Sequence, residues 1–304
     1  MTNQPKAAQH VPWARTHKRI TIFDCVIVVL MLLFAFIFIY PLWTIFVAAF
    51  SEPLDYVKNP LALFPENFTT YNLKNLMTSA TVWMGYSNTL LYTVIGTIIN
   101  VAMTFVMAYA LSLRELPYRR VFSFFVVVTM FFSGGLIPGY LNVKRFSMLN
   151  TLWALVIPGA IGTYNLLITR TYISQQIPEG LVEAAEVDGA GALRTFLQII
   201  TPLSKPILAV ITLFYASGHW NSYYSALIYL KDRDKYPLQL ILREMLINEE
   251  TLGMAATDAG SQVALYTITL NYAVMLVAII PLLIIFPFVQ KFFVKGVMIG
   301  AIKG

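Results

Sequence analysis

The sequence predicts an all-α membrane protein with about six transmembrane helices. Hydrophobic residues make up 58% of its 304 residues and charged residues 12%, whereas about a quarter of an average soluble domain is charged. Six stretches lack Asp, Glu, Lys and Arg, and each can hold the roughly 20 residues that span a bilayer core. They are residues 25–51, 75–113, 121–143, 146–169, 206–230 and 259–290. In lipid the backbone must satisfy its own hydrogen bonds, so such long apolar segments are helices.

The first apolar stretch resembles a secretion signal, because basic residues precede it and Val47-Ala48-Ala49 lies at its end. Its apolar core exceeds the roughly 15 residues of such signals. We therefore expect a retained membrane helix that ends near Phe50 and is kinked at Pro41. The single cysteine, Cys25, excludes a disulfide within the chain.

The distribution of Lys and Arg predicts how the chain is oriented. Thirteen of the 21 Lys and Arg residues fall in the segments that share one side of the membrane with both tails, and eight fall in the others. Because these residues accumulate in cytoplasmic segments, we expect cytoplasmic tails over residues 1–21 and 295–304 and a transmembrane domain over 22–294. The net charge of +6 then reflects topology, since no basic stripe with interleaved aromatic residues indicates nucleic-acid binding.

Apolar runs and helix-breaking residues predict the bounds of the segments after the first helix. An outer segment over residues 51–83 contains several prolines and is expected to hold a short helix near 71–77. A helix over 87–113 leads through a tight inner turn, residues 114–120, into the third helix. Two glycines and a proline in Ser133-Gly134-Gly135-Leu136-Ile137-Pro138-Gly139 predict a break in that helix. This break either lines a solute path or forms a loop at the outer surface.

Three further helices are expected over residues 149–173, 206–230 and 265–293. Asn165, in the first of them, is a polar residue that would face a neighbouring helix or a cavity. No internal repeat is evident, so a transporter built from inverted halves of one chain has no support. Six helices form a thin wall for a large pore, and we expect a second membrane chain to complete it.

The cytoplasmic segment over residues 175–206 is predicted to form two short helices that meet at a bend. Pro178 beside Glu179 marks a helix start, and Gly189 suits a left-handed stop. A second short helix is expected from near Ala192 to Pro202.

The two short helices are either a docking projection or a plain linker. A linker does not need adjacent small residues beside several carboxylates, so the composition favours docking to a basic partner. The residues concerned are Glu183, Ala184, Ala185, Glu186 and Asp188.

This segment resembles the EAA signature of importer permeases in the ABC superfamily. The matching positions are Glu183-Ala184-Ala185, Asp188-Gly189-Ala190, Phe196, Ile199, Pro202 and Pro206. The similarity extends over most of the chain from about Asn88, and includes residues 134–138, 150–155, Trp220-Asn221 and Leu238-Gln239-Leu240. It is typical of carbohydrate-uptake permeases in the MalG-like group, in particular the LplC- and YtcP-like permeases.

The resemblance implies a type I ABC importer permease fold in the bacterial plasma membrane. The chain would be a non-catalytic half of a translocation pathway for an oligosaccharide. Its partners would be a second permease subunit, forming a heterodimer, two cytoplasmic ATPase subunits, and an extracytoplasmic solute-binding protein. ATP and Mg would be bound by the ATPase, and the chain itself has no G-x-x-x-x-G-K-[ST] loop.

The resemblance also implies roles for single residues of the loop. Glu183 and Asp188 would face the ATPase. The small residues of the signature would permit close packing against it: Ala184, Ala185, Gly189 and Ala190.

Sugars are bound by aromatic faces together with planar hydrogen-bonding groups, and the fifth helix supplies such a set. Its members are His219, Trp220, Asn221, Tyr223 and Tyr224. Polar residues at this depth usually face a bundle interior or a cavity, so we expect these residues and Asn165 to line the solute path, Asn221 and Tyr223 first among them. The alternative is an aromatic belt at the outer interface.

An intramembrane hydrolase and a membrane scaffold are the alternatives from other functional classes. His219 has no catalytic partner in the pattern, and no H-E-x-x-H motif, Cys cluster or paired carboxylate indicates a catalytic or metal site. A permease of the same class for a different polar solute also remains open. Lys144 and Arg145 either attract an acidic oligosaccharide or belong to a solvated turn.

Overall fold

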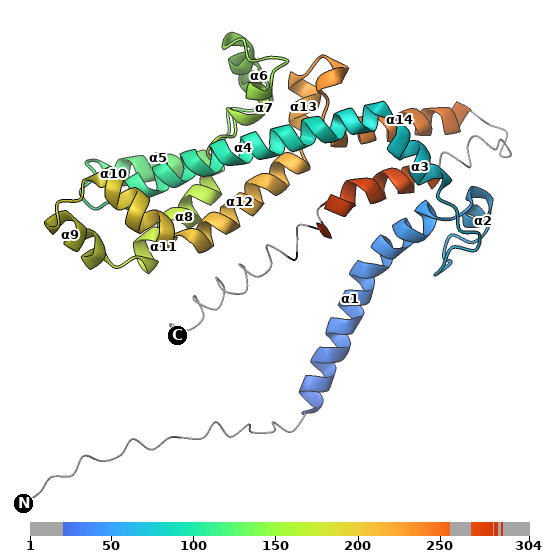
Figure 1. Ribbon diagram of the computed structural model, residues 1–304, viewed down its shortest axis with the longest axis horizontal. Coiled ribbons are helices and arrows are strands. Elements are labelled where there is room, and N and C mark those ends of the chain that lie inside the picture. Colours follow the sequence, from blue (N-terminus) through green and yellow to red (C-terminus); the bar gives the residue numbers. More distant parts are fainter. Residues whose placement is uncertain (1–20, 256–268, 282, 285–286, 288–304) are drawn as a thin grey trace, which may run out of the picture. The chain divides into compact units, whose positions relative to one another are not determined.

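The computed structural model describes residues 21–255, 269–281, 283–284 and 287 of the chain (Figure 1). Two compact units divide the chain, Met1–Thr44 and Ile45–Gly304. The predicted tails lie outside the described residues, apart from Thr21. Within the described part the secondary structure is helical, with one isolated bridge between Ser51 and Phe68 and no strand. The all-α fold class is therefore confirmed.

The first unit contains most of helix α1 (Ile22–Ala49). Its 28 residues extend roughly 42 Å at 1.5 Å per residue, which is more than a bilayer core requires. Apolar side chains from Ile22 to Ile39 are exposed on every side of the helix, as expected for a helix surrounded by lipid. The helix continues through Pro41, and Cys25 is exposed.

Two described helices are long and apolar enough to cross a membrane alone, α1 and α4 (Ala80–Ser112). Two bent pairs each qualify as one broken span. Helices α5 (Arg119–Phe131) and α6 (Leu136–Arg145) meet at 116°, and Ala192–Leu203 meets α12 (Lys205–Trp220) at 80°. A shorter apolar helix covers Thr269–Pro281. The break in the predicted third helix is confirmed, with Gly135 at φ +83°.

Two predicted helices are wrong in extent. In place of one helix over 149–173, the chain forms α7 (Leu152–Val156) and α8 (Thr163–Gln176). Pro158 and the glycines after it lie in the gap, where a missing amide hydrogen and free φ angles favour a turn. The helix predicted over 206–230 ends at Trp220 and resumes as α13 (Tyr224–Tyr229).

Two further short helices lie in the outer segment, α2 (Pro53–Lys58) and α3 (Tyr71–Thr78). The second confirms the short helix expected near residues 71–77. Beyond α13 the chain forms the 3-10 turn η2 (Arg233–Lys235) and helix α14 (Leu238–Ala255). Helix α14 was not predicted from the sequence. The signal for it is Pro237 followed by apolar residues at helical spacing, which are buried at Leu238, Ile241 and Leu242.

Helix α4 is the central helix of the second unit, and α12 lies alongside it (Figure 1). The side chains that α4 buries are mostly small or hydroxyl-bearing, which allows helices to approach closely in a membrane. They include Gly85, Thr89, Gly96, Thr97, Asn100, Thr104 and Ala108. Tyr215 of α12 bonds to Thr104 (Oη to Oγ1, 2.6 Å) and accepts a hydrogen bond from the Gly162 amide at 2.8 Å. It therefore joins α12 to α4 and to the start of α8.

Replacing Gly96 by Ala is expected to lower the free energy of unfolding by about 1 kcal/mol. A Cβ at position 96 would lie 2.5 Å from Nε2 of His219. That ring is fixed by the Asn100 side chain, whose Nδ2 donates to Nε2 at 3.1 Å. Overpacking costs about 1–3 kcal/mol, and the intrinsic gain of Ala over Gly in a helix offsets about 0.5–1 kcal/mol of it.

Gly218→Ala is the matched control for Gly96→Ala. Gly218 is inside α12, and a Cβ there would meet nothing within 4 Å. We expect Gly218→Ala to raise thermal stability in detergent, while Gly96→Ala lowers it. Changes of the same sign in both variants would contradict the close contact at Gly96.

The loop over residues 230–237, which the charge distribution predicts on the outer side and which is named the outer loop, is attached to the rest of the unit through Asn150. Asn150 has φ 61°, and its Oδ1 accepts hydrogen bonds from the amides of Lys231 (3.0 Å) and Asp232 (3.1 Å). Its Nδ2 donates to Oδ2 of Asp232 at 2.6 Å, and its backbone amide donates to the Tyr229 carbonyl at 2.8 Å. One side chain thus connects the α6–α7 turn to the outer loop.

Helix α4 holds the same loop from its other side. Asn88 donates to the carbonyls of Asp234 and Tyr236, and Tyr92 donates to the carbonyl of Lys235. The outer loop is therefore held largely by hydrogen bonds from neighbouring side chains to its backbone.

Candidate functional site

The projection over residues 175–206, which the charge distribution predicts to be cytoplasmic, contains helix α9 (Glu179–Val187), for which Pro178 is the N-cap. Gly189 has φ +78°, and its amide donates to the Glu186 carbonyl while the Ala190 amide donates to the Ala185 carbonyl. This pair of bonds is a Schellman motif, which requires a left-handed residue that glycine adopts without strain. The predicted helix start and glycine stop are both confirmed.

The second arm of the projection contains α10 (Ala192–Thr195), the π-helical turn η1 (Phe196–Ile200) and α11 (Thr201–Leu203). The prediction that this helix ends at Pro202 is wrong, because Pro202 lies inside α11. Since Pro202 has no amide hydrogen, it cannot bond to the Gln198 carbonyl four residues earlier. The Thr201 hydroxyl donates to the Phe196 carbonyl at 2.8 Å.

An aromatic contact anchors the projection to the end of α4. The ring of Phe196 lies 5.0 Å from the rings of both Phe105 and Tyr109, measured between centroids. Ile177 and Ile200 are buried in the same hydrophobic cluster. The projection is therefore packed against α4 and α8 and does not hang from flexible linkers.

The residues of the EAA signature are not all accessible in this arrangement. Glu183, Ala184, Asp188 and Gly189 are exposed, whereas Ala190 is half-buried. Ala185 is only 8% exposed, so it packs inside the chain and is not available for close approach by a partner.

Two apolar side chains at the tip of the projection were not singled out from the sequence. Val187 is 89% exposed and Leu193 is 70% exposed. Large exposed apolar side chains that form a contiguous patch are typical of an interaction surface, and these two are candidates for such a contact. In the sequence, Val187 and Leu193 flank Asp188 and Gly189 at the bend between two short helices. That position is the signal for an exposed tip.

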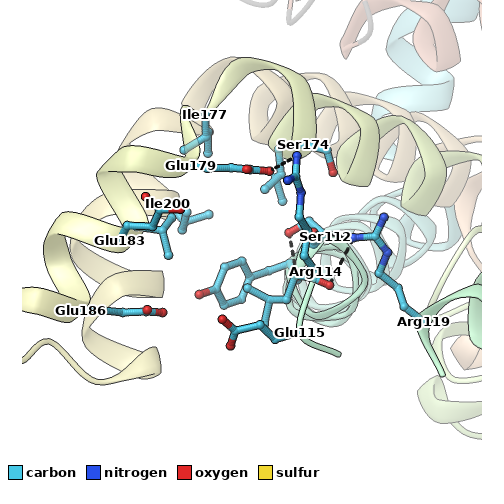
Figure 2. Close-up of a pocket in the computed structure, with 14 residues that line it drawn as sticks. Ser112, Arg114, Glu115, Arg119, Ser174, Ile177, Glu179, Glu183, Glu186 and Ile200 are labelled. Carbon is cyan, nitrogen blue, oxygen red and sulfur yellow. Dashed lines mark hydrogen bonds and ion pairs between the residues drawn. The ribbon is translucent and has the colours of Figure 1, made fainter. Parts of the chain in front are cut away.

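A cavity of about 340 Å³ lies between α9 and the turn from α4 to α5 (Figure 2). Arg114 on the turn forms an ion pair with Glu179 at 2.6 Å. Glu183 and Glu186 extend from α9 toward the side of Glu115 (Figure 2). Glu115, Glu183 and Glu186 form no ion pair with any residue that the structure describes. The cavity is therefore acidic and suits a basic side chain.

The candidate path residues divide between the bundle interior and the surface. His219 lies against Gly96 and Asn100 of α4, as described above. Trp220 is buried, and its Nε1 donates to the Ala278 carbonyl at 3.4 Å. Both side chains therefore contact neighbouring helices, Trp220 as a buried residue and His219 as a half-buried one.

Asn221 and Tyr223 lie in the break between α12 and α13, and both are exposed. Asn221 caps α12, and its Nδ2 donates to the Ser217 carbonyl at 2.9 Å. Asn165 is half-buried on α8, near Gly162 and Tyr215. The structure thus leaves Asn221 and Tyr223 open to a solute and places Asn165 in a helix contact.

No group of three His, Cys, Asp or Glu side chains that could hold a metal ion occurs in the described ranges of the chain. The apolar helices and the broken spans define an integral membrane protein.

The comparisons with known proteins identify the family. The family described as "Binding-protein-dependent transport system inner membrane component" matches residues 79–299, and the chain belongs to it. It is 37% identical over 283 residues to the polygalacturonan/rhamnogalacturonan transport system permease protein YtcP of Bacillus subtilis strain 168, covering 93% of this chain and 99% of YtcP. It is 36% identical to protein LplC of the same strain, covering 88% of this chain and 90% of LplC.

A solved structure is also similar over nearly the whole chain. It is the crystal structure of a bacterial ABC transporter involved in the import of the acidic polysaccharide alginate. One of its chains matches with a TM-score of 0.79 and 32% identity, over 91% of this chain and 98% of that chain. The chain is therefore an ABC transporter permease of the inner membrane, with the corresponding fold.

Proposed function

We propose that this chain forms half of the translocation pathway for an acidic oligosaccharide in an ATP-driven importer. The observation that carries the proposal is the near full-length similarity to YtcP. Its named polymers contain galacturonate, and the similar solved transporter imports an acidic polysaccharide. The exposed aromatic residues Tyr223 and Tyr224 support a sugar as solute, because aromatic faces bind the CH faces of sugar rings.

The proposal includes a cytoplasmic ATPase that docks on the projection over residues 175–206. Glu183 and Asp188 would contact basic residues of the ATPase, and Ala184, Gly189 and Ala190 would permit its approach. The exposed side chain of Val187 supports an apolar contact at the same place. ATP and Mg would be held by the ATPase, and this chain would contribute no catalytic group.

The remaining partners follow from the family and the charge distribution. The family description supports an extracytoplasmic solute-binding protein. A second, different permease subunit would complete the pathway, and the unburied apolar surface of α5 supports a contact with lipid or with that subunit. The excess of Lys and Arg on one side supports a cytoplasmic location for residues 1–21 and 295–304.

Uptake by the reconstituted transporter tests the solute class. Proteoliposomes would contain this chain, the second permease, the ATPase and the solute-binding protein. We expect ATP-dependent accumulation of galacturonate trimer and little accumulation of the neutral galactose trimer. Equal accumulation of both, or of the neutral trimer only, would overturn the assignment of an acidic solute.

A further inference from the structure

Arg243 on α14 lies over the ring of Tyr223, with its Cζ 5.3 Å from the ring centroid. The two residues come from different elements, since Tyr223 occupies the break between α12 and α13. A guanidinium held on an aromatic face keeps a defined position while its N–H groups remain able to bind other partners. The contact therefore presents an oriented cation beside the break.

The charge of Arg243 is not neutralised within the described part of the chain. The neighbouring carboxylate, Glu244, forms its ion pair with Arg233 at 3.3 Å. No ion pair joins Arg243 to any other described residue, although its side chain is half-buried. A partly desolvated guanidinium without a carboxylate is suited to binding an anion from outside the chain.

Two aromatic rings accompany this cation. Tyr223 is 40% exposed and Tyr224 is 55% exposed. Their rings are nearly perpendicular, at 82°, with centroids 6.4 Å apart. A sugar ring that stacks on one of these faces can place a carboxylate near the guanidinium. Aromatic stacking and a forked cation are the two groups that a uronate residue requires, because it has an apolar CH face and a carboxylate on one ring.

We propose that Arg243, Tyr223 and Tyr224 form a binding site for a uronate unit of the solute. This inference rests on the proposed function, since it names the residues that distinguish an acidic sugar from a neutral one. Because a uronan repeats its carboxylate along the chain, successive units can occupy the same site as the solute advances. The guanidinium provides selectivity for the carboxylate, and the tyrosine rings provide contact with the sugar ring.

Binding to the complete transporter tests the site. The transporter is placed in nanodiscs of phosphatidylcholine alone, so that no anionic lipid competes, and binding of galacturonate trimer and galactose trimer is measured by thermophoresis. A hydrogen-bonded ion pair typically contributes enough to favour the acid by about tenfold or more. We expect Arg243→Gln to bind the two trimers about equally, with little change in the affinity for the neutral trimer. Arg243→Lys should restore part of the preference for the acid.

Arg233→Gln is the matched control, because it removes the same charge from a nearby arginine that is already paired with Glu244. It should leave the preference for the acid unchanged. An equal loss in both variants would mean that the general field of the outer surface selects the acid, and would overturn the site. So would an unchanged preference in Arg243→Gln.

The uptake experiment separates failure of the site from failure of the proposed function. If the wild-type transporter accumulates galacturonate trimer but Arg243→Gln binds both trimers as the wild type does, only the site is wrong. If the wild-type transporter does not accumulate the acid, the proposed function is wrong and the site falls with it.

Discussion

Replacing Glu183 by Arg is expected to abolish solute uptake and the ATP turnover that the loaded binding protein stimulates. Glu183 is exposed on α9 and lines the acidic cavity beside the turn from α4 to α5. Loss of one partner from a hydrogen-bonded charge pair at an interface costs about 2–5 kcal/mol, and reversal of the charge adds repulsion. We therefore expect the ATPase to bind at least about 30-fold more weakly, as measured by co-purification and by titration of the ATPase.

Glu115→Arg is the control for this charge reversal. Glu115 lines the same cavity but lies on the turn between α4 and α5 and not on α9. If α9 makes the docking contact, Glu115→Arg retains most of the stimulated turnover. Full uptake by Glu183→Arg would show that Glu183 is not part of the coupling contact. Because Glu183 has no ion pair in the described structure, normal amounts of Glu183→Arg are expected in the membrane.

Replacing Asn150 by Ala is expected to lower the free energy of unfolding by about 2 kcal/mol. Three hydrogen bonds from the Asn150 side chain to the outer loop would be lost, each with a net contribution of about 0.5–1.5 kcal/mol. Alanine also adopts the left-handed conformation, φ 61° here, less readily than asparagine does. Denaturant or thermal unfolding in detergent would measure the loss.

Two further substitutions separate the causes. Asn150→Gly relieves the backbone strain but loses the side-chain bonds, so it should be less destabilising than Asn150→Ala. Asn150→Asp keeps acceptor oxygens for the two loop amides but places a second carboxylate beside Asp232. Equal stability of the wild type and Asn150→Ala would contradict the role of Asn150 in holding the loop.

Because of the same contact, the contribution of Asp232 to the stability of the fold depends on pH. Hydrogen bonds from Lys235 and Asn150 and the nearby positive charges lower the pKa of Asp232 below its ordinary value. A carboxylate whose pKa is lower in the folded state stabilises the fold above its ordinary pKa, and this contribution disappears as pH falls through the lowered value. In Asn150→Ala, the stability of the outer loop should therefore decrease less as the pH falls than it does in the wild type.

The local features that were predicted correctly are those that one or two residues determine. Gly189 ends α9 because only a left-handed residue closes a Schellman motif without strain. Gly135 begins α6 with a positive φ at the predicted break. Both follow from the absence of a Cβ, which is visible in the sequence without knowledge of any neighbour.

The features that were missed depend on contacts between distant segments. Trp220 and Tyr223 lie three positions apart in an apolar stretch, yet one is buried against the Ala278 carbonyl and the other is exposed beside Arg243. Hydrophobicity alone does not distinguish them. The position of Arg243 was not anticipated either, because α14 was not predicted as a helix.

Helix α12 connects the two places that the proposed function requires. It begins at the 80° bend that follows the projection and ends at the break that contains Asn221 and Tyr223. A helix of 16 residues is a stiff rod roughly 24 Å long. A tilt of about 5° around its cytoplasmic end would displace the far end by roughly 2 Å, given the helical rise of 1.5 Å per residue. The position of a single rod would thereby make the position of the break at Tyr223 depend on the state of a partner that binds the projection.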